Sequence, residues 1–232
     1  MGRSRQTEEA FHVALGRMEY GQALALQRRV HALRVRGLVP DVLLTVEHDP
    51  VFTRGRSAGP LEDRAALEEV DRAAIPVVDV ERGGAITYHG PGQLVAYPIV
   101  DLRNHGRDVK RYVATLEDAA IATLNGFGIR ADRRPGYPGV WVEAGKIASI
   151  GIYVREWVTR HGLALNVSVD PTHFGMIDPC GLPVRAVSMS EVLGTPIRLV
   201  DVEAAFASNL AERLGWRLER RAQTALLERV CA

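Results

Sequence analysis

Hydrophobic positions along this 232-residue chain follow two different periods. Short apolar and β-branched runs at 11–15 and 42–46 predict strands, and the segment 20–36 between them predicts a helix that Gly37 ends. A second helix is predicted over 108–125, where apolar residues recur at helical spacing. These recurring positions are Val109, Tyr112, Val113, Leu116, Ala120 and Leu124.

Several predicted strands in the middle of the chain are separated by glycine, proline and asparagine. Because strands alternate with helices, we expect an α/β or α+β layer arrangement in which these strands form one sheet. A further helix is predicted over 200–214. The chain is expected to form a single domain over 1–232, with 185–232 as a candidate small C-terminal subdomain. The predicted central strands are 85–88, 94–100, 140–143, 146–154 and 163–169.

Composition excludes several classes of protein. Lys and Arg number 29 against 28 Asp and Glu, which gives a net charge of +1 and no electrostatic case for binding nucleic acid or an anionic membrane. No apolar run approaches the roughly 18 residues that span a bilayer, and residues 1–10 do not resemble a signal peptide. The two cysteines suit a reducing compartment, so we expect a cytoplasmic protein.

Cys180 is the only interior cysteine, since Cys231 is next to the last residue. It lies in the loop 178–183, where prolines restrict the backbone and a glycine frees it, so the loop can present a thiol. Only a few per cent of an ordinary thiol is ionised at pH 7, and a nucleophilic Cys180 therefore needs an activating partner. The alternative is that Cys180 fills a small apolar gap.

The segment 82–93 contains four glycines and a proline around a short polar and aromatic strand. Glycines let main-chain N–H groups approach a ligand or a neighbouring strand, whereas the alternative is two tight turns around a hairpin. The polar side chains of Arg82, Thr87, His89 and Gln93 favour a ligand site. The glycine spacing does not match the dinucleotide-binding fingerprint GxGxxG.

Lys146 begins an apolar strand, a position that is otherwise typical of an edge-strand lysine. A phosphate loop is excluded because Ile147 stands where Ser or Thr is required. His161 precedes another apolar strand, in which Asn166 must be hydrogen-bonded if it is buried. The chain lacks metal-ligand spacings and the GxSxG elbow. Cys180 is therefore the strongest nucleophile candidate, and its possible activators are Lys146, His89 and His161.

Five motifs, in this order and spacing, resemble those of the lipoyl(octanoyl) transferases over most of the chain. The motifs are Arg82-Gly83-Gly84 through Gln93, Gly139-Val140-Trp141, Gly145-Lys146-Ile147-Ala148, the segment 157–167, and Pro179-Cys180-Gly181. The resemblance implies the mixed β-sheet flanked by helices of the biotin and lipoate protein ligases. We also expect a monomer without cofactor or metal that binds neither nucleic acid nor membrane.

The implied reaction takes an octanoyl group from octanoyl-acyl carrier protein onto Cys180 as a thioester. The group then passes to a lysine on the lipoyl domains of 2-oxoacid dehydrogenase E2 subunits and the glycine cleavage H protein, in the first step of endogenous protein lipoylation. The resemblance implies that Lys146 lowers the pKa of Cys180, with His161 and Asn166 as possible support. The implied substrate-binding residues are Arg82, Gly83, Gly84, Ala85, Ile86, Thr87, Tyr88, His89, Ser149, Ile150, Gly151, Gly162, Leu163 and Ala164.

Chemistry agrees with this reaction, because a thioester carries its own activation and needs no ATP. Burial of each methylene group contributes about 0.8 kcal/mol, so an eight-carbon chain offers about 5 kcal/mol for selecting its length. Two alternatives stay open: an ATP-dependent lipoate or biotin ligase, which would not need a cysteine, and a non-catalytic module that holds an acylated carrier. Candidate arginines for docking an acidic carrier are Arg54, Arg56, Arg155 and Arg160.

Overall fold

The computed structural model describes residues 7–58, 73–176 and 185–224. Eight strands form one sheet in the order β11-β1-β2-β6-β10-β9-β8-β7, and three strands form a smaller sheet in the order β4-β3-β5. The large sheet consists of β1 (Glu8–Met18), β2 (Asp41–His48), β6 (Gln93–Ile99), β7 (Asp132–Arg134), β8 (Tyr137–Val142), β9 (Gly145–Arg155), β10 (Val158–Asn166) and β11 (Trp216–Arg220). The small sheet consists of β3 (Val51–Arg54), β4 (Val77–Asp79) and β5 (Ile86–His89).

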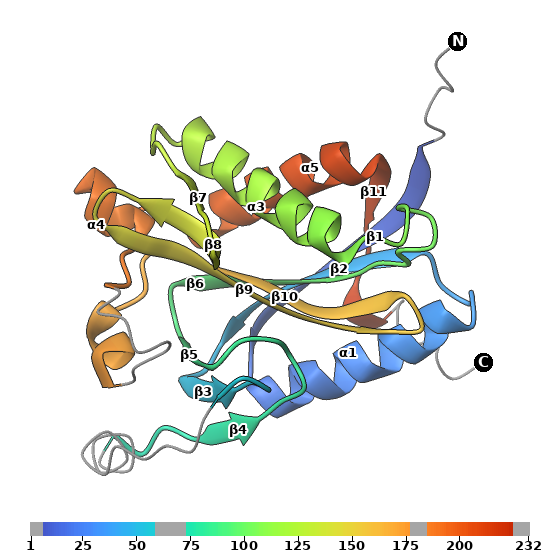
Figure 1. The fold of residues 1–232 in the computed structure, drawn as a ribbon, viewed down its shortest axis with the longest axis horizontal. Coiled ribbons are helices and arrows are strands. Elements are labelled where there is room, and N and C mark those ends of the chain that lie inside the picture. Colours follow the sequence, from blue (N-terminus) through green and yellow to red (C-terminus); the bar gives the residue numbers. More distant parts are fainter. Residues whose placement is uncertain (1–6, 59–72, 177–184, 225–232) are drawn as a thin grey trace.

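Helices cover both faces of the large sheet (Figure 1). Two of them lie on one face and enclose the larger hydrophobic core, while the first helix and the small sheet lie on the opposite face. Among the helices of the described residues, none combines the length and the apolar character needed to cross a bilayer. The helices are α1 (Tyr20–Val35), α3 (Val109–Gly126), α4 (Met189–Leu193) and α5 (Leu199–Leu214), with the 3-10 helix η1 (Pro171–Met176).

Both long helices predicted in the first half of the chain are confirmed, and local chemistry explains where they begin. The Glu19 carboxylate accepts hydrogen bonds from two free N–H groups at the start of α1, and the Asp108 carboxylate does the same for one such group of α3. After α1, Gly37 takes a positive φ of 71°, a conformation that glycine adopts without steric cost. The helix predicted over 200–214 is confirmed as α5.

The prediction of one central sheet is wrong for the strand at 85–88. This segment forms β5, which pairs antiparallel with β3 in the small sheet, because Thr87 and Tyr88 face Thr53 and Phe52. The sequence pattern shows that a strand exists but not which strand it pairs with. At the other end of the chain, β11 pairs parallel with β1, and α5 packs on α3.

Candidate active site

A cavity of about 490 Å³ lies between the large sheet and the segment that leads into β5. Its floor is built by neighbouring positions of β9 and β10 whose side chains are small or absent. Ser149 pairs with Ala164, and Gly151 pairs with Gly162. Since side chains alternate across a strand, these positions share one face of the sheet and leave it hollow.

One end of the cavity is closed by the segment that follows β4. The N–H of Gly83 donates to the carbonyl of Ile152 at 2.9 Å, which joins this segment to β9. The Arg82 guanidinium donates to the carbonyl and hydroxyl oxygens of Thr53 and to the carbonyl of Gly83. Burial lowers the pKa of Arg82. The glycines of this segment thus both contact a neighbouring strand and line the cavity.

Buried hydrogen bonds connect this end of the cavity with the other end. His89 donates from Nδ1 to the Gln93 side chain at 2.7 Å, and its Nε2 lies 3.4 Å from the Thr53 hydroxyl. Gln93 donates to the side chain of Asn166, which donates to the carbonyl of Val187. Burial lowers the pKa of His89 to about 3, so its imidazole is neutral at pH 7. The prediction that a buried Asn166 must be hydrogen-bonded is confirmed.

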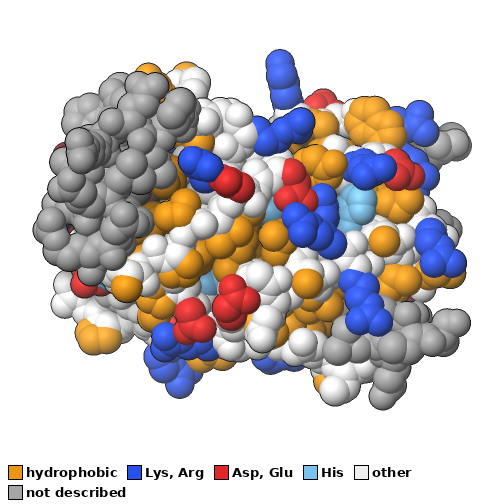
Figure 2. All heavy atoms as spheres, turned by 90° about the horizontal axis from the view of Figure 1, so that it is seen from below, with side chains coloured by type: hydrophobic (Ala, Val, Ile, Leu, Met, Phe, Trp, Pro, Cys, Tyr) orange, Lys and Arg blue, Asp and Glu red, His pale blue; other side chains and the backbone are white. Residues whose placement is uncertain are grey.

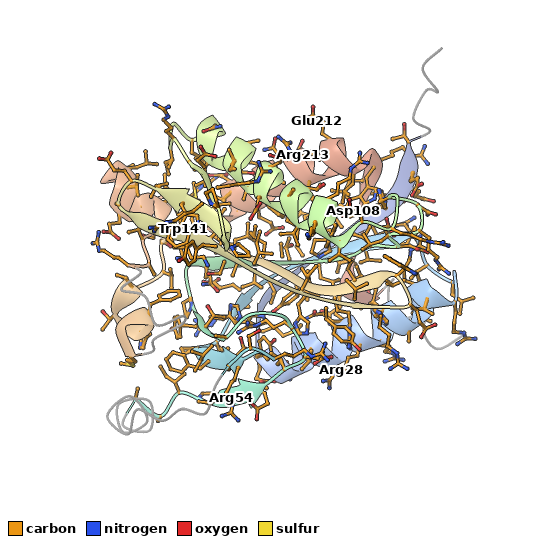
Figure 3. All side chains as sticks on the ribbon, in the orientation of Figure 1. Arg28, Arg54, Asp108, Trp141, Glu212 and Arg213 are labelled. Carbon is orange, nitrogen blue, oxygen red and sulfur yellow. The ribbon has the colours of Figure 1, made fainter. Side chains whose placement is uncertain are left out.

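Lys146 lines the other end of the cavity. It lies in β9, between β10 and β8, so the edge-strand interpretation is wrong. Its Nζ lies 5.3 Å from the centroid of the Trp141 ring, which Figure 3 labels on β8. Gly139 makes room for this side chain, because a Cβ at Gly139 would stand 2.7 Å from Lys146 Cε. The main chain of Lys146 also hydrogen-bonds with Arg185 and Val187, which follow residues 177–184, a stretch that includes Cys180.

His161 lies at the end of the cavity that Gly83 closes, since it pairs with Ile152. Its φ of 56° is unusual for a residue other than glycine, and its N–H donates to the Gln27 side chain. Burial lowers the pKa of His161 to about 4. Six positions of β9 separate Ile152 from Lys146, which places His161 about 20 Å along the strand. His161 and Lys146 therefore lie at opposite ends of the cavity.

The structure brings nearly all sequence-predicted site residues to this one cavity. Tyr88 is different, because its ring packs against Phe52, His173 and Phe174. Cys180 and Cys231 lie outside the described residues. The predicted residues that line the cavity are Arg82, Gly83, Gly84, Ala85, Ile86, Thr87, His89, Lys146, Ser149, Ile150, Gly151, His161, Gly162, Leu163, Ala164 and Asn166.

Sequence reasoning missed other lining residues, which come from elements far apart in the chain. Trp141 had a signal in the sequence, because it belongs to the motif Gly139-Val140-Trp141, but the rest are apolar or aromatic residues that look like ordinary core positions. The missed residues include Tyr20, Val95, Tyr97, Tyr137, Trp141, Ile152, Phe174 and Ala186.

One group of possible metal ligands lies elsewhere in the described part of the chain, at Glu8, Asp41 and His105. Asp41 is already engaged there, because its carboxylate accepts hydrogen bonds from Arg34 and Trp216. The positively charged Arg34 guanidinium beside this carboxylate repels a metal cation. This group is explained by the ion pair and carries no metal assignment.

On the face that Figure 2 shows, acidic and basic side chains are interspersed. Four arginines were suggested for docking an acidic carrier. Three of the four are within 4 Å of a carboxylate, which neutralises much of their field. Docking of an acidic carrier through them therefore stays a prediction. The pairs are Arg54 with Asp79, Arg155 with Glu156, and Arg160 with Glu81.

The protein is a mixed sheet between helices, with an apolar cavity on one face of the sheet and a lysine at one end of that cavity. The architecture is similar to the crystal structure of a lipoate-protein ligase A bound with ATP, with a TM-score of 0.79 at 16% identity over 96% of this chain and 92% of that chain. The fold predicted from the sequence is thus confirmed.

Sequence comparisons define the family. The model of the lipoyl protein ligase A/B catalytic domain matches residues 19–211, and the chain belongs to this family. It is 45% identical to an octanoyltransferase of Syntrophobacter fumaroxidans over 87% of this chain and 89% of the relative. It is 48% identical to an octanoyltransferase of Solibacter usitatus over 85% of this chain and 89% of the relative.

Proposed function

We propose that this protein is an acyltransferase that moves an octanoyl group from octanoyl-acyl carrier protein, through a thioester on Cys180, to a lysine of a lipoyl domain. The observation that carries the proposal is the apolar cavity with Lys146 at one end. Relatives at 45% and 48% identity bear the name octanoyltransferase, which supports the same acyl group.

Chain connectivity supports Cys180 as the partner of Lys146. The carbonyl of Arg185 accepts a hydrogen bond from the N–H of Lys146 at 2.9 Å. Cys180 precedes Arg185 by five residues, so their Cα atoms are at most about 18 Å apart. The other two candidate activators fit less well, since His89 has both ring nitrogens near hydrogen-bond partners and His161 lies at the opposite end.

The proposed reaction has two balanced steps. The Cys180 thiolate, stabilised by the Lys146 ammonium, attacks the thioester carbonyl; a new C–S bond forms, the bond to the carrier breaks, and its thiolate takes a proton from Lys146. The lipoyl-domain amine then attacks the acyl-enzyme. A C–N bond forms, the bond to Cys180 breaks, and the neutral Lys146 amine takes the proton that the incoming amine loses.

The first test is intact mass spectrometry after mixing the protein with octanoyl-loaded carrier protein without ATP. We expect one octanoyl increment, removed by hydroxylamine, on the wild type and on Cys231→Ser, and none that hydroxylamine removes on Cys180→Ser. Because the chain has two cysteines, Cys231→Ser is a matched control. Acylation that requires ATP and survives Cys180→Ser would favour a ligase, and stable binding of the carrier without any acyl transfer would favour a binding module.

A further inference from the structure

Two fixed side chains in the cavity lie a defined distance apart, and the first of them is Lys146. A Cβ placed on Gly139 would stand 3.3 Å from Lys146 Nζ and 2.4 Å from the carbonyl oxygen of Ala148. The ammonium group therefore lies close to the main chain of Ala148 on β9, because both are near the same point at Gly139.

The second side chain is Arg82. A Cβ placed on Gly151 would stand 3.0 Å from Arg82 Cδ and 2.8 Å from the carbonyl oxygen of Gly83. The aliphatic part of Arg82 thus lies across the floor at Gly151. Its guanidinium is fixed in place by Thr53 and Gly83, so the side chain is not free to swing aside.

The distance between these two side chains matches one chain length. Ala148 and Gly151 are three residues apart, which is about 10 Å along a strand. An eight-carbon acyl chain has seven C–C bonds of about 1.5 Å, so its extended length is at most about 10 Å. A chain whose carbonyl lies at Lys146 would place its terminal methyl group against Arg82.

The Arg82 end also resists further apolar groups because it is polar. Arg82 is buried, and Nε2 of the buried His161 has no hydrogen-bond partner among the described residues. Extra methylenes would have to displace the guanidinium from its acceptors, and unpaired buried polar groups are costly.

We propose that Arg82, lying over Gly151, is the specificity-determining residue that stops the acyl chain at eight carbons. The inference rests on the proposed function, which places the carbonyl end at Lys146. It assigns Arg82 the role of an end stop in the cavity, acting on chain length and not on the chemical step.

The test measures binding of straight-chain alkanoates of six, eight, ten and twelve carbons by titration calorimetry, which needs no acyl transfer. For the wild type we expect Kd to fall about fourfold per added carbon up to eight and then to rise. For Arg82→Ala we expect the fall to continue to ten or twelve carbons, so that ten carbons bind at least tenfold more tightly than eight. Arg54→Ala, which changes a half-buried arginine of the small sheet that does not line the cavity (Figure 3), should keep the optimum at eight.

Arg82→Gln provides a second variant, because its amide can still donate to Thr53 while its side chain is shorter. It should shift the optimum in the same direction if Arg82→Ala does not fold. An unchanged optimum at eight carbons in a folded Arg82 variant, or no chain-length optimum in the wild type, would overturn the end stop. Octanoyl transfer is measured separately with the mass assay, so a shifted optimum without any transfer would refute the transferase and retain the stop.

Discussion

The two faces of the sheet at β9 and β10 differ, because one face packs in the hydrophobic core and the other lines the cavity. On one face, Ala148 and Leu165, which pair with each other, belong to the large core that α3 and α5 cover. On the other face, the paired glycines Gly151 and Gly162 leave the hollow that becomes the cavity. Alternate positions of one strand thus supply the rigidity and the empty space.

This difference shows how a fold keeps a binding site without losing stability. Removing side chains from a sheet face forfeits apolar burial, so the missing contacts must be offset elsewhere. Here the offset is the opposite face, where Leu116 and Leu210 are fully buried against the sheet. Substitutions on the two faces should therefore have separable effects on activity and on stability.

The largest effect should come from Lys146→Ala on the cavity face. Loss of the group that holds the thiolate and moves the proton should reduce octanoyl transfer by about 10²- to 10⁴-fold. Stability should change little, since the contact of Nζ with the Trp141 ring is worth about 1 kcal/mol. Transfer from octanoyl-loaded carrier protein to a lipoyl domain, together with urea denaturation, measures both quantities.

Lys110→Ala is the control for that measurement, because Lys110 is the only other lysine of the chain and is exposed on α3. It should transfer octanoyl groups at the wild-type rate. Equal rates for Lys146→Ala and Lys110→Ala would show that the lysine in the cavity takes no part in the reaction.

The core face should give the reverse result. Leu165 is fully buried, so Leu165→Ala should lower the free energy of unfolding by about 2–5 kcal/mol. Ser149→Ala, at a half-buried position of the cavity floor, should stay within about 0.5 kcal/mol of the wild type. Urea denaturation followed by circular dichroism measures both. A loss of similar size in the two variants would mean that the faces do not differ in their contribution to stability.

Sequence reasoning located the three long helices, most strands of the large sheet and much of the cavity, but not β3, β4, β7 or β11, and these gaps have physical causes. The sequence pattern located α1, α3 and α5. Local signals marked some of their ends, such as Asp108 at the start of α3 and Gly37 after α1. Glycines and polar side chains marked Arg82 and Lys146, but the pairing of β5 with β3 depends on long-range contacts that no local pattern encodes. Aromatic lining residues such as Tyr97 look like core, since burial in a cavity wall and burial in a core require the same residue types.

Two histidines of the cavity should also make the stability of the protein respond to mild acid. Burial lowers the pKa of His89 to about 3 and that of His161 to about 4, whereas an unfolded histidine titrates near 6.5. As pH falls below about 6.5 the unfolded chain takes up protons that the folded chain does not, so stability is complete above this pH and decreases down to the folded values. Each histidine contributes at most about 1.4 kcal/mol per pH unit.

His89→Gln should therefore reduce the slope of the unfolding free energy against pH between pH 6 and pH 5. The reduction corresponds to about one proton, or about 1.4 kcal/mol per pH unit. Leu165→Ala, on the other face, should lower the whole curve and leave this slope unchanged, because it alters no titrating group. Urea denaturation of the wild type and both variants at pH 7, 6 and 5 measures the slopes above the range in which most carboxylates titrate. An unchanged slope in His89→Gln would contradict the neutral imidazole. It would show that His89 is charged in the folded protein while its Nδ1 donates to Gln93.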